Sequence, residues 1–225
     1  MVQREIVRSK KWQKRKKKRY LDFDIEDLLD TLCDNAEKDI KDFHDVINLH
    51  ADLDRNICIG EIYDGIGRSV EGIIHFWNSY DEKHNIPVDE RKPIQLIIDS
   101  PGGDLLETFI IIDAIKISKT PIHAFVIGTA YSGGFFIAIS ADKRYGYKHS
   151  SYLFHEGSAH NGGTSGQFEN FTAFYKKQLG QLKDIVLKET NITEEEYERI
   201  KREDIWYDAY EALEKGIIDE IIGEN

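Results

Sequence analysis

The sequence contains only two cysteines among its 225 residues, Cys33 and Cys58. Two thiols cannot build a disulfide framework, and they cannot supply by themselves the four ligands of a structural zinc site. We therefore interpret both as small buried hydrophobic residues in a reducing compartment.

Long apolar runs are also missing. No stretch approaches the roughly 18 residues that cross a bilayer, and residues 1–20 lack the apolar centre of a secretory signal. Apolar residues nevertheless make up 40% of the chain, which is enough for a substantial core. We expect a cytoplasmic protein with no membrane partner.

Charge is distributed unevenly along the chain. The formal net charge is −11, yet residues 1–20 carry ten Lys or Arg residues against one acid, Glu5. Such a tail can be a solvated, disordered arm, or it can touch nucleic acid or an acidic partner. We favour the disordered arm. The acidic remainder of the chain argues against a dedicated nucleic-acid domain.

Three regions follow from the pattern of residues. Residues 1–20 form the basic tail, and residues 21–50 form an acidic segment with leucine and isoleucine at helical spacing. Residues 51–225 alternate short apolar runs with helical ones, which predicts a compact α/β domain. Its longest predicted helix covers residues 167–189.

The segment DSPGGD, residues 99–104, directly follows a predicted strand. Pro101 fixes a turn, and Gly102 and Gly103 allow bare backbone to approach a ligand. Backbone N–H groups in such a turn can stabilise a developing oxyanion. The segment is not a phosphate loop, because no Gly-Lys-Ser/Thr follows it. An ordinary strand-to-helix turn is the alternative interpretation.

The segment GTAYSGGFF, residues 128–136, places Ser132 between a predicted strand and a predicted helix. It is similar to a nucleophile elbow, although Ala130 replaces the first glycine of G-x-S-x-G. A hydroxyl at a helix N-terminus is favoured by the helix dipole when it becomes negatively charged, and the Gly133 N–H lies beside it in the chain. In the alternative interpretation, Ser132 only caps the helix.

A nucleophilic serine needs a base, and His155 ends the predicted strand SYLFHE. His160, in the polar loop that follows, is a weaker candidate, and a structural role is the alternative for either histidine. The base in turn needs an acid to orient it. With 41 acidic residues in the chain, spacing alone selects none.

Taken in order, these segments resemble the proteolytic subunit of Clp protease, the ClpP family, over roughly residues 55–222. The segments that carry the resemblance are GEIYDGIGRSVEGIIHF, LIIDSPGGDLLET, GTAYSGGFFIAI, YLFHEG and REDIWYDAYEALEKGIIDEI. The resemblance implies an α/β fold of the ClpP and crotonase type, a spiral of ββα units. The long helix after GSAHNGGTSG would be the handle by which two rings dock.

The resemblance also implies a serine endopeptidase. Ser132 would be the nucleophile, His155 the general base and Asp204 the acid that orients it. The N–H groups of Gly103 and Gly133 would form the oxyanion hole. No metal or organic cofactor is implied.

The partners implied are further copies of the chain, in a heptameric ring or double ring that encloses a chamber. The implied substrates are peptides or unfolded polypeptides. A Clp-type ATPase is a candidate partner, because the chain has no nucleotide-binding motif of its own.

The chain departs from the family in two places. Most relatives carry Ala-Ser-Met-Gly at the nucleophile, where residues 131–134 here read YSGG, and the family's Asp-Arg-Asp is RED at residues 202–204. Such divergence would suit a phage-encoded or specialised member. Two alternatives stay open: a ring or scaffold subunit with impaired catalysis, and an acyl-CoA enzyme of the crotonase type, which shares the fold.

Overall fold

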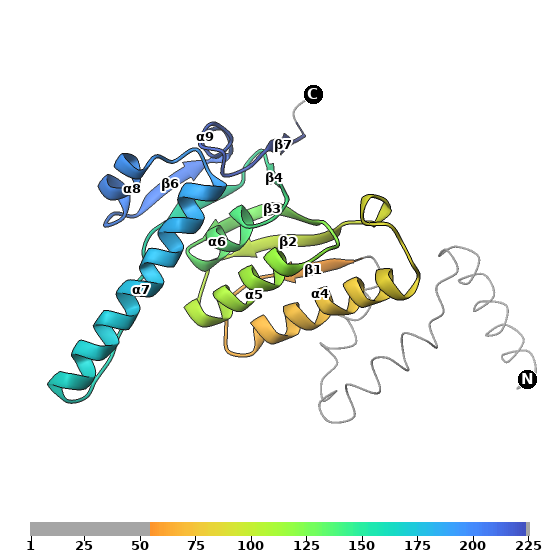
Figure 1. Ribbon diagram of the computed structural model, residues 1–225. Helices are drawn as coiled ribbons and strands as arrows, with labels where there is room; N and C mark the ends of the chain where they lie inside the picture. The colour runs from red at the N-terminus through yellow and green to blue at the C-terminus, as the bar shows by residue number, and fades with distance from the viewer. Residues whose placement is uncertain (1–54, 224–225) are drawn as a thin grey trace, which may run out of the picture. The chain divides into compact units, whose positions relative to one another are not determined.

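The computed structural model describes residues 55–223 (Figure 1). The predictions for residues 1–20 and 21–50 therefore lie outside the described residues. The elements are, in order, β1 (Asn56–Ile59), α4 (Ile66–Lys83), η1 (Val88–Glu90), β2 (Ile94–Ser100), α5 (Leu105–Ile117), β3 (Ile122–Tyr131), α6 (Gly133–Ile139), β4 (Lys143–Tyr147), β5 (Ser151–Phe154), α7 (Ser165–Glu189), α8 (Glu194–Ile200), β6 (Ile205–Asp208), α9 (Ala209–Glu214) and β7 (Glu220–Ile222). This alternation confirms the predicted α/β class.

The seven-stranded sheet is organised around β3. Strands run in the order β1-β2-β3-β4-β7, all parallel. Beyond its contact with β2, β3 pairs with β4 through residues 123–126 and with β5 through residues 129–131. Strand β5 then pairs antiparallel with β6. The end of β3 therefore leads into a separate small branch of the sheet, made of β5 and β6.

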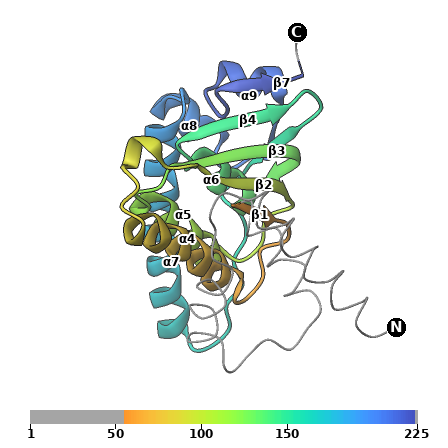
Figure 2. The ribbon, with the colours of Figure 1, turned by 90° about the vertical axis from the view of Figure 1, so that its right-hand side faces the viewer.

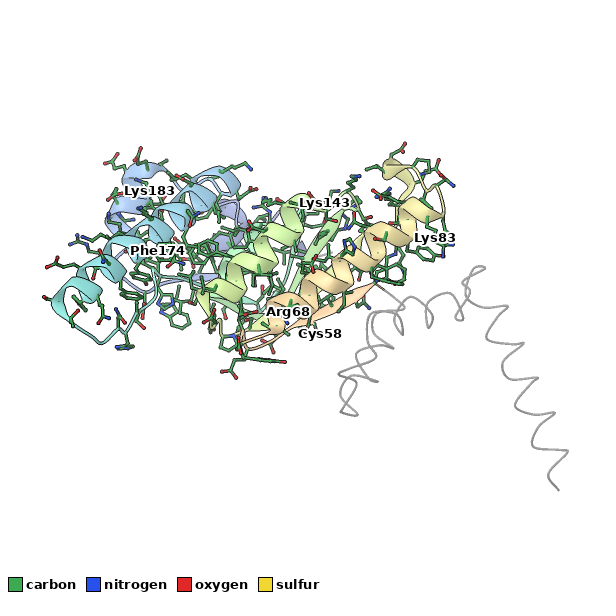
Figure 3. All side chains as sticks on the ribbon, turned by 60° about the horizontal axis from the view of Figure 1, so that its bottom comes forward. Cys58, Arg68, Lys83, Lys143, Phe174 and Lys183 are labelled. Carbon is green, nitrogen blue, oxygen red and sulfur yellow. The ribbon has the colours of Figure 1, made fainter. Side chains whose placement is uncertain are left out.

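Helices α4, α5 and α6 lie along one face of the sheet (Figure 1 and Figure 2). The strand side chains that point toward them are fully buried, as in β2, where burial alternates along the strand. The other face is only partly covered, and Cys58 of β1 lies there, exposed (Figure 3). The interpretation of Cys58 as a buried residue is therefore wrong, because Ile57 and Ile59 take the two inward positions.

Helix α7 extends well beyond the body that it packs on (Figure 1). Its 25 residues span about 38 Å, and a capping box between Thr164 and Gln167 starts it two residues before the predicted beginning. Its buried residues all lie in the C-terminal half, whereas Phe168 and Phe174 are 54% and 56% exposed. Figure 3 shows Phe174 and Lys183 along this helix. The predicted long helix is confirmed.

A buried ion pair ties the start of β1 to α4. The Arg55 guanidinium donates to both carboxylate oxygens of Asp81, at 2.8 and 2.5 Å, and to the carbonyl of Lys92 at 2.7 Å. Thr120 also donates to Asp81, at 2.8 Å. Asp81 is fully buried, and the Arg55 guanidinium lies 4.4 Å from the Trp77 ring centroid. The charges are thus compensated by hydrogen bonds on several sides.

Candidate active site

Three strand ends bring together three of the residues singled out in the sequence. Ser132 follows β3, His155 follows β5 and Asp204 precedes β6. Tyr131 pairs with Leu153 across β3 and β5, and Phe154 pairs with Ile205 across β5 and β6. Because β5 and β6 are antiparallel, the residue after β5 lies opposite the residue before β6. The register therefore gathers the three residues at one end of this branch.

Ser132 occupies a sharp turn between β3 and α6. Its φ of 51° and ψ of −118° are rare for a residue with a side chain. The Ser132 N–H donates to the Leu153 carbonyl at 3.0 Å, and its own carbonyl accepts from Phe135 N–H at 3.0 Å. The hydroxyl makes no capping hydrogen bond with α6. The geometry does not support the interpretation of Ser132 as only a helix cap, and it leaves the hydroxyl available.

The DSPGGD turn is held in place by a short bridge to the segment after β1. Ile62 N–H donates to the Gly102 carbonyl at 2.9 Å, and Asp104 N–H donates to the Ile62 carbonyl at 2.8 Å. Neither of these bonds uses the Gly103 N–H. Gly102 and Gly103 have φ values of 92° and 150°, which favour glycine. Asp104 then caps α5 by accepting the N–H groups of Leu106 and Glu107.

The two glycine turns are in direct contact. A methyl group at Gly102 would lie 2.7 Å from Cβ of Ser132 and 3.0 Å from the Gly133 nitrogen. One at Gly133 would lie 2.5 Å from Oγ1 of Thr108 and 3.6 Å from the Gly103 nitrogen. Only glycine fits at these approaches. The amides of Gly103 and Gly133 consequently lie close to each other and next to Ser132.

His155 and Asp204 face each other across the end of the β5–β6 branch. His155 Nδ1 lies 3.4 Å from Asp204 Oδ1, and the two side chains are 29% and 65% exposed. The contact is longer than a good charge-assisted hydrogen bond. Nε2 of His155 is buried and has no hydrogen-bond partner among the described residues. His160, the alternative base, is exposed in the loop before α7.

Sequence reasoning missed two sets of contacts around this site. Tyr131 donates to or accepts from Ser151 Oγ at 2.8 Å, and its ring meets the ring of Trp206 edge to face at 4.9 Å. The main-chain carbonyl of Glu156 accepts from Tyr175 of α7 at 3.1 Å. No local pattern reports such contacts, because each joins elements that are distant in the chain.

A metal centre is not indicated in the described part of the chain. Within residues 55–223, no group of three or more His, Cys, Asp or Glu side chains is arranged to hold an ion. In the same residues, no helix combines the length and apolar character that a membrane span needs.

Comparison with known proteins identifies the family. The family model described as Clp protease matches residues 84–225. The ATP-dependent Clp protease proteolytic subunit 2 of Treponema pallidum is 32% identical over 133 residues, which cover 58% of this chain and 67% of that protein. The proteolytic subunit of Lactococcus lactis strain IL1403 is 31% identical over 180 residues, 76% of this chain and 85% of that protein. The proteolytic subunit of Streptococcus mutans is 29% identical over 177 residues, which cover 76% of this chain and 86% of that protein. The chain belongs to the Clp protease family, as a divergent ClpP-type member.

Proposed function

We propose that the chain is a serine endopeptidase in which Ser132 is the nucleophile, His155 the general base and Asp204 the acid that orients it. One observation carries the proposal. The strand register brings these three side chains to one end of the β3, β5 and β6 ladder, beside a turn that leaves the Ser132 hydroxyl uncapped. A nucleophile, a base and an acid that orients the base are the three groups that a catalytic triad combines.

The orientation of the imidazole supports a separate role for each of its two nitrogens. Nδ1 faces Asp204, so Nε2 is the atom that takes the proton from Ser132 Oγ as Oγ attacks the peptide carbonyl. The oxyanion of the tetrahedral intermediate accepts hydrogen bonds from the N–H groups of Gly103 and Gly133. His155 then gives the proton to the leaving amine, and the acyl-enzyme forms. Water, activated in the same way, releases the acyl group and restores Ser132.

Ser132 and His155 must move closer for this chemistry. Nε2 of His155 has no hydrogen-bond partner in the described part of the chain, and the contact of Nδ1 with Asp204 is long, at 3.4 Å. Hydrogen bonds of this kind are often loose without substrate and tighten when substrate binds. We expect substrate binding or assembly to close the Ser132 to His155 distance.

Association with further copies is part of the proposal. Helix α5 exposes apolar side chains on its outward side, where Leu106, Ile110 and Ile117 are 59%, 39% and 75% exposed. The free half of α7 adds the exposed rings of Phe168 and Phe174. Apolar surface of this kind marks a binding surface. We infer a homo-oligomer, a heptameric ring or double ring, that encloses the site and admits peptides or unfolded polypeptides. The relatives are named as subunits of ATP-dependent proteases, which favours a Clp-type ATPase as a further partner.

A fluorophosphonate probe tests the assignment of the nucleophile. We expect the full-length protein to be labelled at Ser132 and to cleave a fluorogenic peptide, and Ser132→Ala to lose both activities. Ser158→Ala, in the exposed loop after His155, is the matched control and should keep both. Labelling that persists in Ser132→Ala would disprove the assignment.

A second function is favoured by one observation, the unpartnered Nε2 of His155. If the base never reaches Ser132, the chain is a ring or scaffold subunit with impaired catalysis. Wild-type protein that forms rings but is neither labelled nor active would support this function. The acyl-CoA alternative has no comparable observation in its favour, and the family match is to Clp protease.

A further inference from the structure

Tyr131 contacts both of the strands that carry the proposed base and acid. Its hydroxyl shares a hydrogen bond of 2.8 Å with Ser151 Oγ of β5. Its ring meets the Trp206 ring of β6 at a centroid distance of 4.9 Å and an angle of 81°, a favourable edge-to-face geometry. Tyr131 itself is the last residue of β3, directly before Ser132. One side chain therefore links all three strands of the site.

The backbone alone holds these strands weakly. The ladder between β3 and β5 has three residue pairs, and the one between β5 and β6 has four. Within residues 55–223, β6 pairs with no strand other than β5, and Figure 1 shows it beside α8, away from β1. A two-stranded antiparallel pair is only marginally stable by itself. Side-chain contacts must therefore help to set where β6, and Asp204 with it, lies.

We infer that Tyr131 is a positioning residue, an aromatic brace that holds the β5–β6 branch, and with it His155 and Asp204, beside Ser132. The inference rests on the proposed function of Ser132, His155 and Asp204. The methyl group of an alanine at position 131, as in the Ala-Ser-Met-Gly pattern, is too short to contact either Ser151 or Trp206. This chain thus uses a side-chain link where that pattern provides none.

Removal of the brace should affect catalysis more than binding. If β6 shifts, Asp204 moves away from His155 Nδ1, and the protonated imidazole loses the carboxylate that contacts it. The turnover number then falls, and the acid limb of its pH profile moves to lower pH, while KM for a short peptide changes little. A residue with a merely structural role would lower the folded fraction and leave the pH profile in place.

Substitutions at Tyr131, Ser151 and Trp206 separate the two contacts of the brace. Tyr131→Phe keeps the ring and removes the hydrogen bond, as Ser151→Ala does from the other side. Each should lower kcat about 2- to 10-fold, and the double variant should be no worse than either alone. Tyr131→Ala removes both contacts and should lower kcat about 10- to 100-fold. Trp206→Phe, which keeps an aromatic edge, should retain more activity than Trp206→Ala.

The matched control is Tyr145→Ala. Phe125 and Tyr145 form another aromatic pair, stacked at 4.7 Å, which joins β3 to β4 and not to the β5–β6 branch. This variant removes an aromatic ring of the same size from the same sheet, and its kcat should stay within about twofold of wild type. Oligomer size is measured for every variant by light scattering, so that a change in assembly is recognised.

Hydrogen exchange provides a readout that does not depend on activity. The backbone amides of Ile205 and Tyr207, which lie opposite Phe154 and Tyr152 in the β5–β6 ladder, should exchange faster in Tyr131→Ala than in wild type and Tyr145→Ala, because β6 opens more often. If both the exchange rates of β6 and kcat are unchanged in Tyr131→Ala, the positioning role of Tyr131 is refuted while the peptidase proposal stays intact. Wild-type protein without labelling at Ser132 would sink the peptidase proposal instead, and the exchange rates would still decide whether Tyr131 holds β6.

Discussion

Replacement of Gly103 by alanine tests the position of the oxyanion donors. The φ of Gly103 is 150°, a conformation that side chains rarely adopt, and a methyl group there would overlap the carbonyl oxygen of Ile62. That oxygen accepts the bridge hydrogen bond from Asp104, so no rotamer change relieves the overlap. The turn must move away from Ile62, and the Gly103 amide must move with it.

The expected size of the effect follows from these contacts. Backbone strain of this kind costs about 1–3 kcal/mol, which should lower the unfolding midpoint by about 2–12 °C for a domain of this size and leave the protein folded at 25 °C. Loss of one oxyanion donor lowers kcat about 10²- to 10³-fold. We therefore expect a large loss of turnover in a protein that is still folded, with a smaller effect on KM.

Peptide cleavage and thermal unfolding are measured side by side on Gly103→Ala and on Gly60→Ala. Gly60 lies two residues before Ile62, and a methyl group there would meet nothing within 4 Å. Its substitution should leave both kcat and the midpoint close to wild type. The reasoning is refuted if Gly103→Ala keeps kcat within about threefold of wild type, since an oxyanion donor is worth far more.

Three further predictions concern the acid, the buried ion pair and two tyrosines. Asp204→Asn should lower kcat about 10⁴-fold without unfolding the protein, because the amide cannot stabilise a protonated base. Asp81→Asn should destabilise the fold by about 3–5 kcal/mol in chemical denaturation, since it leaves the Arg55 guanidinium buried without its partner. Burial raises the pKa of Tyr152 to about 12, and burial, followed by the charge of a nearby glutamate, raises the pKa of Tyr207 to about 12. Both tyrosines stay protonated in the fold where the unfolded chain would ionise near pH 10, so stability should fall as the pH rises from about 10 to 12, by about 3 kcal/mol for Tyr152.

Each of these predictions has its own control. Asp208→Asn changes an acid that caps α9 four residues after Asp204, and it should leave kcat nearly unchanged. Glu82→Gln breaks the exposed pair with Lys119 and should cost less than about 1 kcal/mol; an equal loss in Asp81→Asn would contradict the role of burial. Tyr207→Phe removes a buried hydroxyl that has no hydrogen-bond partner among the described residues. It should be neutral or stabilising at pH 7 and should reduce the alkaline loss, and a large loss at pH 7 would contradict this reasoning.

The sequence predicts local structure well here, because local causes determine it. Helix α5 begins at Leu105 and ends at Ile117, the range of its apolar run. The site is different. That His155 lies opposite Asp204 depends on the antiparallel register of β5 and β6, and no spacing rule selects that acid from 41 candidates; only the family resemblance does. Cys58 shows the opposite case, since the alternation of Ile57 and Ile59 already implied its outward position.

The contact of Tyr131 with Trp206 could not be predicted at all. It passes over β5, a strand to which neither residue belongs, and both aromatic residues have ordinary strand patterns. The available signal was the departure of residues 131–134 from the family pattern. Such a departure shows where a chain differs, and only the fold shows what the new side chain touches.

The backbone conformation at Ser132 creates a trade-off between catalytic activity and thermal stability. Glycine adopts a φ of 51° without the cost that a side chain incurs, so Ser132→Gly should unfold at a higher temperature than the wild type while losing the nucleophile. A screen for thermostable variants would therefore select the inactive Ser132→Gly protein. Substitutions that make an enzyme from this chain more thermostable must therefore lie outside the Ser132 turn.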